Sequence, residues 1–323
     1  MDPTWWLLEA RKRLLLDSAL APNTLNTYQV GIRQYVAFCR SFEVSPLPLR
    51  EPVLENFCVS LSSRISHKSI KVYLCGVQFW SKINGGSVLI ENMLRLDYVI
   101  TAIRRAQGTS FDRPARPPVT LQMLQEICAF ISNTESPFDR DMLTAAVLLA
   151  FFGLLRVSEY TCPSSSTFDA SSNLLVSDVT IDWKKKVARI FIKKSKTDPF
   201  RKGVTIRVGV LPHYLCPVHA LIRYLMRRGT SSGPLFLFQN GAYLTRVRVL
   251  DILTRSLPNV PFVNTHSFRR GGASALAAAN TPAYVIQILG RWRSNAYAQY
   301  IQLPDSFFVQ ANSVMTRMPK DGS

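Results

Sequence analysis

A histidine and an arginine stand three positions apart in the stretch THSFRRGGASALAAAN, which runs from Thr265 to Asn280. Three positions are close to one turn of an α-helix, so His266 and Arg269 project side by side if this segment is helical. An imidazole beside a guanidinium fork is a suitable set of donors for an anionic oxygen. The alanine-rich remainder of the segment needs no such beginning. We therefore interpret the pair as part of an anion-binding group.

A second arginine follows the longest apolar run, LTAAVLLAFFGLL, which covers 143–155. Arg156 comes next, and an arginine beside a buried helix needs an anion because an unpaired buried charge is costly. Glu159, one turn further on, is the expected structural partner. A helix-end ion pair is the alternative to a functional role for Arg156.

Three more features have residue types that could do chemistry. Lys196 lies in KKSKTDPFRKG, at the end of a predicted strand, where a solvated lysine is the alternative. The basic-aromatic corner 291–293 (RWR) follows Gly290. Tyr297 and Tyr300 lie on the short helix predicted after that corner, where packed aromatic side chains are the alternative.

The elements that must position these residues are mostly helices. In the first hundred residues, apolar side chains recur at helical spacing. We expect helices over 24–42, 51–65, 67–83 and 92–108, with Thr24 as the N-cap of the first. The segment GTSFDRPARPPVT then contains three prolines and a glycine, which is typical of an exposed connector. We place the domain boundary there.

The second half combines helices with one small sheet. Thr120 begins a helix over 121–131, and a buried helix is expected over 141–155. Alternating and β-branched residues predict a three-stranded antiparallel meander at 179–183, 187–193 and 204–208. Helices resume at Pro217. Near the end, Thr281 as cap and Pro282 in the first turn begin a helix that stops at Gly290, and Ser294 or Asn295 begins the next.

Composition points to a polyanionic partner. The chain of 323 residues has 39 Lys and Arg against 21 Asp and Glu, a net charge of +18. Sixteen basic residues and only two acidic ones lie between Trp183 and Arg255, a field suited to a phosphate backbone. The longest apolar run is too short to cross a bilayer, and the amino-terminal segment lacks the pattern of a secretory signal.

The six cysteines are scattered and typical of free thiols in a reducing compartment. Cys216 and His219 have the spacing of a metal-ligand pair, and His213 is the one further candidate nearby. A buried helix start is the interpretation we favour for LCPVHA, so we predict no metal site.

Taken in order, the chain offers Arg156, Lys196, His266-x-x-Arg269, Leu-Gly-Arg-Trp and a tyrosine ten residues after Gly290. This order and spacing resemble the tyrosine recombinase (phage integrase-like) family, over about 22–304. The acidic residue three places after the first arginine also fits the family pattern. The segments SFRRGGA and LGRWRSNAYAQYI look most like recombinases of eukaryotic mobile elements such as the DIRS-type retrotransposons.

The resemblance implies a mainly α fold with a small antiparallel β-meander, arranged as a two-domain, C-shaped clamp around DNA. A helical core-binding domain (1–107) and a linker (108–119) would precede a mixed α/β catalytic domain (120–304) and a tail (305–323). That tail is apolar enough to dock on a neighbouring subunit, and packing on its own domain is the alternative.

The resemblance also implies the chemistry. Tyr300 would attack a DNA phosphate and form a 3′-phosphotyrosine link, with Tyr297 as the rival nucleophile. Arg156 and Arg269 would hold the nonbridging oxygens, and Glu159 would orient Arg156 or His266. His266 would hydrogen-bond the phosphate or help to take the tyrosine proton, and Lys196 would protonate the leaving 5′-oxygen. No metal, ATP or other cofactor is implied, because the guanidinium groups supply the positive charge.

The sequence departs from the family at one catalytic position. Many members have His or Trp directly after Leu-Gly, nine residues before the tyrosine. Here Arg291 occupies that place and Trp292 follows one residue late. Arg291 is a candidate donor to a phosphate oxygen and Trp292 a candidate packing residue, and the sequence leaves open which of them takes the family role.

The expected partner is double-stranded DNA, with a homotetramer on paired sites and neither a membrane nor a small-molecule substrate. The expected location is the nucleus for a eukaryotic source and otherwise the cytoplasm (nucleoid). Two alternatives remain: a domesticated DNA-binding protein that has lost turnover, and a type IB topoisomerase-like nicking-closing enzyme. Candidate DNA-binding residues are Lys68, Lys71, Arg104, Arg105, Lys193, Lys194, Arg201, Lys202, Arg270 and Arg293.

Overall fold

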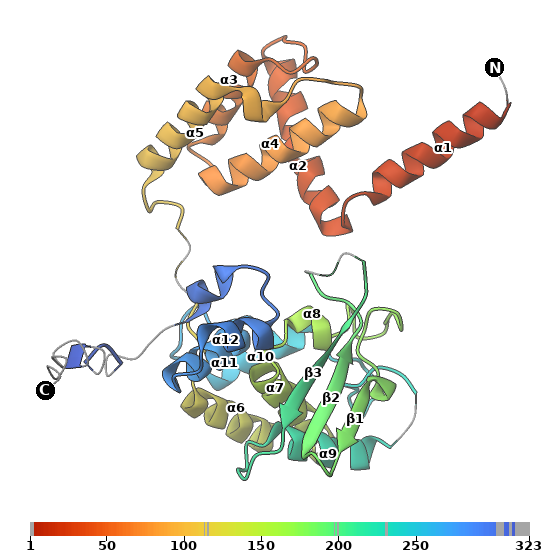
Figure 1. The fold of residues 1–323 in the computed structure, drawn as a ribbon, viewed down its shortest axis with the longest axis vertical. Coiled ribbons are helices and arrows are strands. Elements are labelled where there is room, and N and C mark those ends of the chain that lie inside the picture. The colour runs from red at the N-terminus through yellow and green to blue at the C-terminus, as the bar shows by residue number, and fades with distance from the viewer. Residues whose placement is uncertain are drawn as a thin grey trace, which may run out of the picture. The chain divides into compact units, whose positions relative to one another are not determined.

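The computed structural model describes residues 3–112, 114, 116–196, 198, 200–229, 232–301, 307–309 and 312–313. The chain divides into two compact units, Met1–Arg113 and Pro114–Ser323 (Figure 1). The division falls inside the proline-rich segment of 108–119. No helix in the described ranges combines the length and apolar character that a membrane span requires.

The first unit is helical. Its elements are α1 Pro3–Ser18, α2 Pro22–Ser41, α3 Glu51–Leu61, α4 His67–Ile83, the 3₁₀ helix η1 Ile90–Asn92 and α5 Leu94–Gln107. The prediction of Thr24 as a helix cap is wrong. Pro22 occupies the first turn of α2 and no side chain caps it, because proline already has the φ angle of a helix and lacks the N–H that would need a cap.

The core of the first unit lies between α2, α3, α4 and α5. Tyr35, Leu54, Phe57 and Ile70 are almost fully buried there. Helices α2 and α4 can approach closely because Gly31 has no side chain. A methyl group there would come within 2.7 Å of Tyr73 Cα. Outside this core, α1 exposes most of its tryptophan and leucine side chains.

The second unit combines further helices with the sheet. The helices are α6 Leu121–Thr134, α7 Pro137–Phe152, α8 Val157–Tyr160, α9 Pro217–Arg228, α10 Arg246–Ser256, α11 Ser267–Ala278 and α12 Ala283–Gly290, with 3₁₀ helices η2 Val176–Asp178 and η3 Asn295–Tyr300. Helix α7 is buried on nearly every side. It therefore forms the centre of the unit, and the chain that follows it starts from a fixed place.

The sheet confirms the predicted meander. Strands β1 Val179–Asp182, β2 Val187–Ile192 and β3 Val204–Gly209 pair antiparallel in the order β1-β2-β3 (Figure 1). Ile190 faces Val179 on one side and Ile206 on the other. One face of the sheet packs on the core through Ala188, Ile190 and Ile192 of β2. The mainly α fold with a small antiparallel sheet is thus as predicted.

Two helix boundaries in this unit differ from the prediction. Helix α7 begins at Pro137 and ends at Phe152 rather than covering 141–155. Ser136 caps it by accepting a hydrogen bond from the Asp139 amide at 3.3 Å. Thr281 does not cap α12, whose N-cap is Pro282 without a side-chain bond.

Predictions were also made for the cysteines and for the carboxy-terminal tail. All six cysteines are free, and Cys216 caps α9 by accepting the His219 amide at 3.4 Å, which agrees with the predicted helix start. Most of 305–323 lies outside the described residues, while Phe308 and Val309 are exposed.

Candidate active site

The site begins at the tight turn after α7. Leu154 adopts a positive φ of 48°, an uncommon conformation for a residue with a branched side chain. The chain then enters α8, with Arg156 as its N-cap residue. Glu159 folds back and accepts hydrogen bonds from the Arg156 amide at 2.9 Å and from Arg156 Nη1 at 3.0 Å. The ion pair predicted between these residues is therefore present.

Helix α11 supplies His266 and Arg269, as the sequence indicated. Its start is set by Asn264, whose Oδ1 accepts the His266 amide at 2.9 Å, and by Ser267, whose Oγ accepts the Asn264 amide at 3.1 Å. A methyl group at Gly271 or Gly272 would overlap the carbonyl of Val119 (2.0 Å) or Phe151 (2.5 Å). The Gly-Gly pair therefore lets α11 lie directly against α7 and the connector.

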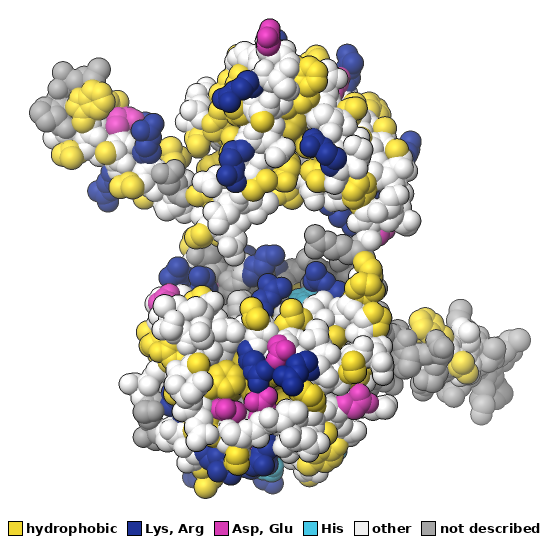
Figure 2. Space-filling view, turned by 180° about the vertical axis from the view of Figure 1, so that it is seen from behind, with side chains coloured by type: hydrophobic (Ala, Val, Ile, Leu, Met, Phe, Trp, Pro, Cys, Tyr) yellow, Lys and Arg dark blue, Asp and Glu magenta, His cyan; other side chains and the backbone are white. Residues whose placement is uncertain are grey.

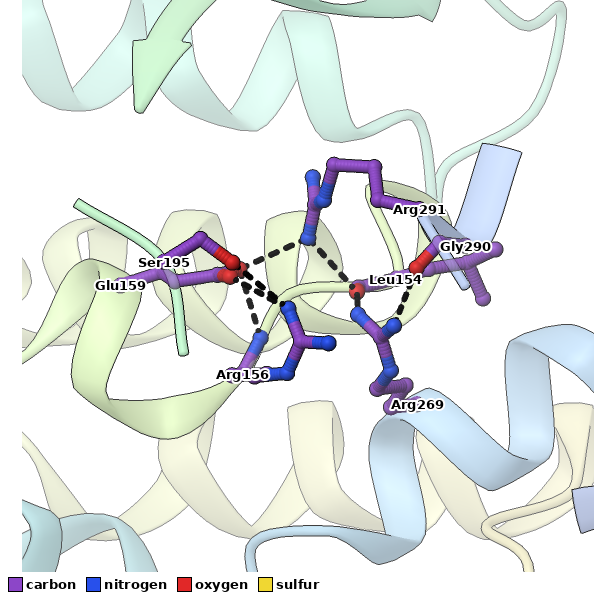
Figure 3. Close-up of polar contacts among 7 residues, drawn as sticks. All are labelled: Leu154, Arg156, Glu159, Ser195, Arg269, Gly290 and Arg291. Atoms are coloured by element: carbon purple, nitrogen blue, oxygen red, sulfur yellow. Dashed lines mark hydrogen bonds and ion pairs between the residues drawn. The ribbon is translucent and has the colours of Figure 1, made fainter. Parts of the chain in front are cut away.

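Arg269 lies at the bottom of the site and is 1% exposed. Its Nη1 donates to the Leu154 carbonyl and its Nη2 to the Gly290 carbonyl (Figure 3). The Trp292 ring covers the guanidinium at 4.3 Å from Cζ to the ring centroid. Arg269 thus joins the turn after α7 to the end of α12.

The corner after α12 places three consecutive residues on the site. Gly290 must be glycine, because a methyl group there would lie 1.5 Å from the Trp292 ring. Arg291 takes the left-handed conformation (φ 56°, ψ 41°) that ends the helix. Its Nη2 donates to Glu159 Oε2 at 2.7 Å and to the Leu154 carbonyl at 3.2 Å (Figure 3). The corner therefore contacts both arginines that come from other segments, Arg269 directly and Arg156 through Glu159.

The two candidate tyrosines follow this corner. Tyr297 is half-buried and packs near Trp292, with ring centroids 6.1 Å apart. Tyr300 is the last residue of η3. This segment is a 3₁₀ helix, at the place where the sequence predicted a short helix. The Tyr300 side chain lies outside the described part of the structure, so its role as nucleophile stays a prediction.

The loop between β2 and β3 carries Lys196. Lys193, at its base, forms an ion pair with Asp178 at 2.6 Å. Ser195 Oγ accepts a hydrogen bond from Arg156 Nη1 at 2.9 Å (Figure 3). Lys196 is the next residue and is exposed, so the structure brings the chain at Lys196 next to the arginine group. Ser195 was not predicted as a site residue, and the signal that could have found it is its place beside the candidate lysine.

Electrostatics hold His266 in its neutral form. Burial and, to a smaller extent, the positive charges of Arg269, Arg116, Arg270 and Arg156 together lower the pKa of His266 to about 4. At neutral pH the imidazole therefore has one N–H donor and one acceptor nitrogen. Arg116, in the connector, was missed by the sequence reasoning. It lies close enough to act on His266 because Val119 of the same segment donates to the Ser267 carbonyl at 3.0 Å.

Three guanidinium groups thus lie around one carboxylate and one backbone carbonyl. Arg156 and Arg291 donate to Glu159, and Arg269 and Arg291 donate to the Leu154 carbonyl. The side chain of Glu159 is 1% exposed, that of Arg156 16% and that of Arg291 10%. Among the described residues, no carboxylate other than Glu159 pairs with Arg156 or Arg291. With Arg269 included, positive charge exceeds negative charge in this group, and an anion is the ligand that would balance it. The same residues include no group of three or more His, Cys, Asp or Glu that could hold a metal ion.

The candidate DNA-binding residues fall into three sets. Lys68, Lys71, Arg104 and Arg105 are exposed on the first unit, and Lys194, Arg201, Lys202 and Arg293 are exposed on the second. Arg270 is half-buried, and the charge of Lys193 is already paired with Asp178. Figure 2 shows Lys and Arg side chains gathered beside a histidine at the upper end of the second unit.

No protein-family model matches the sequence, and no curated protein matches it. Solved structures do resemble the fold. The XerH site-specific recombinase bound to palindromic difH substrate matches with a TM-score of 0.62 and 17% identity, over 90% of this chain and 80% of that chain. The Tn1549 transposon integrase in complex with transposon right end DNA matches with a TM-score of 0.61 and 14% identity, over 95% and 98%. A lambda integrase dimer bound to a COC′ core site matches with a TM-score of 0.56 and 15% identity, over 91% and 76%.

The fold is that of the tyrosine recombinases. At these identities the likeness concerns the fold alone, and none of these structures bears on the resemblance to the DIRS-type elements.

Proposed function

We propose that this protein is a site-specific DNA recombinase that breaks and rejoins DNA through a covalent link to Tyr300. One observation carries the proposal: three guanidinium groups from distant segments lie together. Arg156 and Arg291 donate to the buried carboxylate of Glu159, and Arg269 and Arg291 donate to the Leu154 carbonyl. Such an excess of guanidinium donors suits a phosphodiester, whose nonbridging oxygens gain negative charge in the transition state.

In the proposed cleavage step, each bond that forms or breaks and each proton that moves is assigned to a group. The Tyr300 oxygen forms a bond to phosphorus while the bond from phosphorus to the 5′-oxygen breaks. Lys196 gives a proton to the departing 5′-oxygen, and the tyrosine proton passes to His266 or to water. The 3′-phosphotyrosine keeps the energy of the broken bond, so attack by a 5′-hydroxyl reverses the step without ATP.

The position of each group supports its role. Arg156 is partly exposed, and its Nη1 lies 2.9 Å from Ser195 Oγ, directly before Lys196 in the loop. The arginine that orients the phosphate and the lysine that gives a proton to the 5′-oxygen would therefore reach the same site. His266 is neutral because its pKa is lowered to about 4 by burial and by neighbouring arginines, and we assign it a hydrogen bond to the phosphate.

The partner we propose is duplex DNA. The net charge of +18 supports this, as do the DNA complexes named for the XerH, Tn1549 and lambda proteins. We further propose integration or excision of a mobile element by a homotetramer on paired sites, in the nucleus if the source is eukaryotic.

One observation favours a second candidate, a DNA-binding protein without turnover. Arg269 is 1% exposed, both of its terminal nitrogens donate to backbone carbonyls, and Trp292 covers it. If DNA does not rearrange this group, the phosphate has one fewer arginine and cleavage would stop. The two candidates differ in covalent adduct formation, not in DNA binding.

The test is covalent capture of DNA. The protein is mixed with a random library of duplexes, each nicked so that the short cleaved strand diffuses away, and DNA that stays attached in detergent is sequenced. The recombinase proposal expects adducts with wild type and with Tyr297→Phe but none with Tyr300→Phe. Adducts that form with Tyr300→Phe but not with Tyr297→Phe would show that Tyr297, and not Tyr300, is the nucleophile. Salt-sensitive binding without any adduct would favour the protein without turnover.

A further inference from the structure

A second group of basic and aromatic side chains lies at the end of the sheet opposite to the Lys196 loop. The turn between β1 and β2 has the sequence WKKK (183–186), and all four side chains are exposed. Strand β2 leads from this turn to the loop that carries Lys196 (Figure 1). It has six residues, so its two ends are about 17 Å apart at the usual rise of a strand. The turn is therefore a surface separate from the arginine group.

The chain after β3 lies beside this turn. The Val210 amide donates to the Lys186 carbonyl at 2.9 Å, and His213 and Tyr214 follow a few residues later. A hydrogen bond fixes the histidine ring, because its Nδ1 accepts the Leu215 amide at 3.1 Å. Since Nδ1 is the acceptor, the ring proton lies on Nε2, which can donate to a ligand. Two segments that are distant in sequence thus form one surface.

Large aromatic rings are exposed on both segments. Trp183 and Tyr214 are each 65% exposed. The rings of His213 and Tyr214 are stacked, with centroids 4.4 Å apart and 28° between their planes. Because the histidine is itself held by a hydrogen bond, the stacked tyrosine has a fixed orientation and loses little conformational entropy when a ligand binds. A flat ring held in this way in solvent is a surface on which a nucleobase stacks.

The lysines of the turn lack a counter-ion. Lys184, Lys185 and Lys186 form no ion pair with a carboxylate in the part of the chain that the structure describes. Asp182, directly before the turn, already pairs with Arg189 at 2.9 Å and accepts the Lys185 amide at 3.0 Å. Figure 2 shows Lys and Arg side chains gathered at the lower end of the second unit as well as at its upper end. Unpaired positive charge beside exposed rings suits a ligand with phosphates and bases.

We propose that the turn 183–186 and the His213–Tyr214 pair form a second nucleic-acid site, which binds an unpaired strand. Bases stack on the rings of Trp183 and Tyr214, and the three lysines contact phosphates. Exposed rings favour an unpaired strand over a duplex, because the base pairs of a duplex already stack on one another. The site goes beyond the proposed function, since it uses neither Tyr300 nor the arginine group. One molecule can therefore hold an unpaired strand and a duplex at different places.

The test maps where an unpaired strand lies on the whole chain. The probe is an oligothymidylate in which 5-iododeoxyuridine replaces some thymidines, because irradiation links this base to an aromatic side chain stacked on it. Cross-linked peptides are identified by mass spectrometry. The affinity for fluorescein-labelled oligothymidylate is measured by anisotropy for wild type, Trp183→Ala, Tyr214→Ala and Tyr284→Ala. Tyr284 is the matched control, since it is also 65% exposed and lies on α12 of the same unit.

Both measurements are made with an excess of unlabelled duplex, which occupies the DNA surface of the proposed recombinase. Cross-links are expected at Trp183 or Tyr214. Loss of either ring should weaken binding by about 10-fold, the usual effect of removing one base–aromatic stack, and Tyr284→Ala should leave the affinity unchanged. Replacing all three lysines of the turn by glutamine should lower the slope of log Kd against log salt concentration by about 2, because each phosphate contact on a single strand contributes about 0.7.

Cross-links at other residues only, or unchanged affinity in both ring variants, would overturn the site. If the cross-links at these rings form without duplex and disappear when duplex is added, the surface takes duplex and the assignment of an unpaired strand is wrong. Equal displacement of the probe by polyglutamate at the same concentration would show that charge alone binds, as an acidic protein would. If a variant does not fold by its melting curve, the cross-link map of wild type decides. A wild type that cross-links at Trp183 but forms no covalent adduct with duplex would contradict the recombinase proposal and support this site.

Discussion

Removing the charge of Glu159 tests how the site is held together. Glu159→Gln keeps the shape of the side chain but replaces one carboxylate oxygen with an NH₂ group. The carboxylate accepts three hydrogen bonds, from the Arg156 amide at 2.9 Å, from Arg156 Nη1 at 3.0 Å and from Arg291 Nη2 at 2.7 Å. In the variant, a donor faces donors and two guanidinium groups lose their counter-ion.

The expected cost follows from burial. Removing one partner of a buried ion pair destabilises a protein by about 3–5 kcal/mol. Arg156 and Arg291 keep 16% and 10% of their side-chain exposure, so water compensates part of the loss. We expect about 3 kcal/mol, which lowers the melting temperature of a unit of this size by roughly 6–12 °C.

Calorimetric unfolding at pH 7 measures this effect. Asp251→Asn is the matched control in the same unit, because Asp251 is 40% exposed and its ion pair with Arg248 is partly solvated, so we expect a loss below about 1 kcal/mol. A loss for Glu159→Gln no larger than that of the control would refute the claim that one carboxylate holds both arginines in place.

Three further predictions concern the neighbouring residues. Gly290→Ala should destabilise the protein by about 1–3 kcal/mol, because the new methyl group meets the Trp292 ring at 1.5 Å; a double-mutant cycle with Trp292→Ala should remove most of that loss, and additive effects would contradict the clash. Lys196→Ala should slow cleavage of an ordinary duplex by about 10²–10⁴-fold but not of a duplex with a sulfur in place of the leaving 5′-oxygen, which departs without a proton; equal slowing of both would exclude the general-acid role. The folded pKa of His266 is about 4, below its ordinary value of 6.5, so between these pH values the unfolded chain binds more protons than the folded protein. The free energy of unfolding should therefore fall as the pH drops from 6.5 towards 4. If His266→Gln has the same slope of unfolding free energy against pH as wild type, the lowered pKa is contradicted.

The elements were predictable where one local pattern decided them. Alternation and β-branching gave the meander, and the apolar period gave α4 at His67–Ile83, as predicted. The start of α7 was missed because its first turn carries charged residues, among them Asp139. Asp141 is buried in the structure and pairs with Arg227 of α9, a contact between segments that the local pattern does not contain.

The site was predictable in residue type but not in connection. Order and spacing indicated Arg156, Glu159 and Arg269. The backbone carbonyls of Leu154 and Gly290, which accept hydrogen bonds from Arg269 and Arg291, were not predicted. The positive φ of Leu154 that turns its carbonyl into the site has no sequence signal, because glycine is the usual residue there. The Gly-Gly pair of α11 did offer a signal for close packing that was left unused.

The hydrogen bonds to the Leu154 carbonyl can form only late in the synthesis of the chain. This carbonyl accepts from Arg269 and from Arg291, which lie 115 and 137 residues later in the chain. During synthesis the amino-terminal part emerges first, so Glu159 can pair with Arg156 locally long before its second partner exists. The group of Arg156, Arg269 and Arg291 is therefore complete only when the corner after α12 has been made. A nascent chain that ends before this corner has most of the basic residues of the second unit but not the complete arginine group.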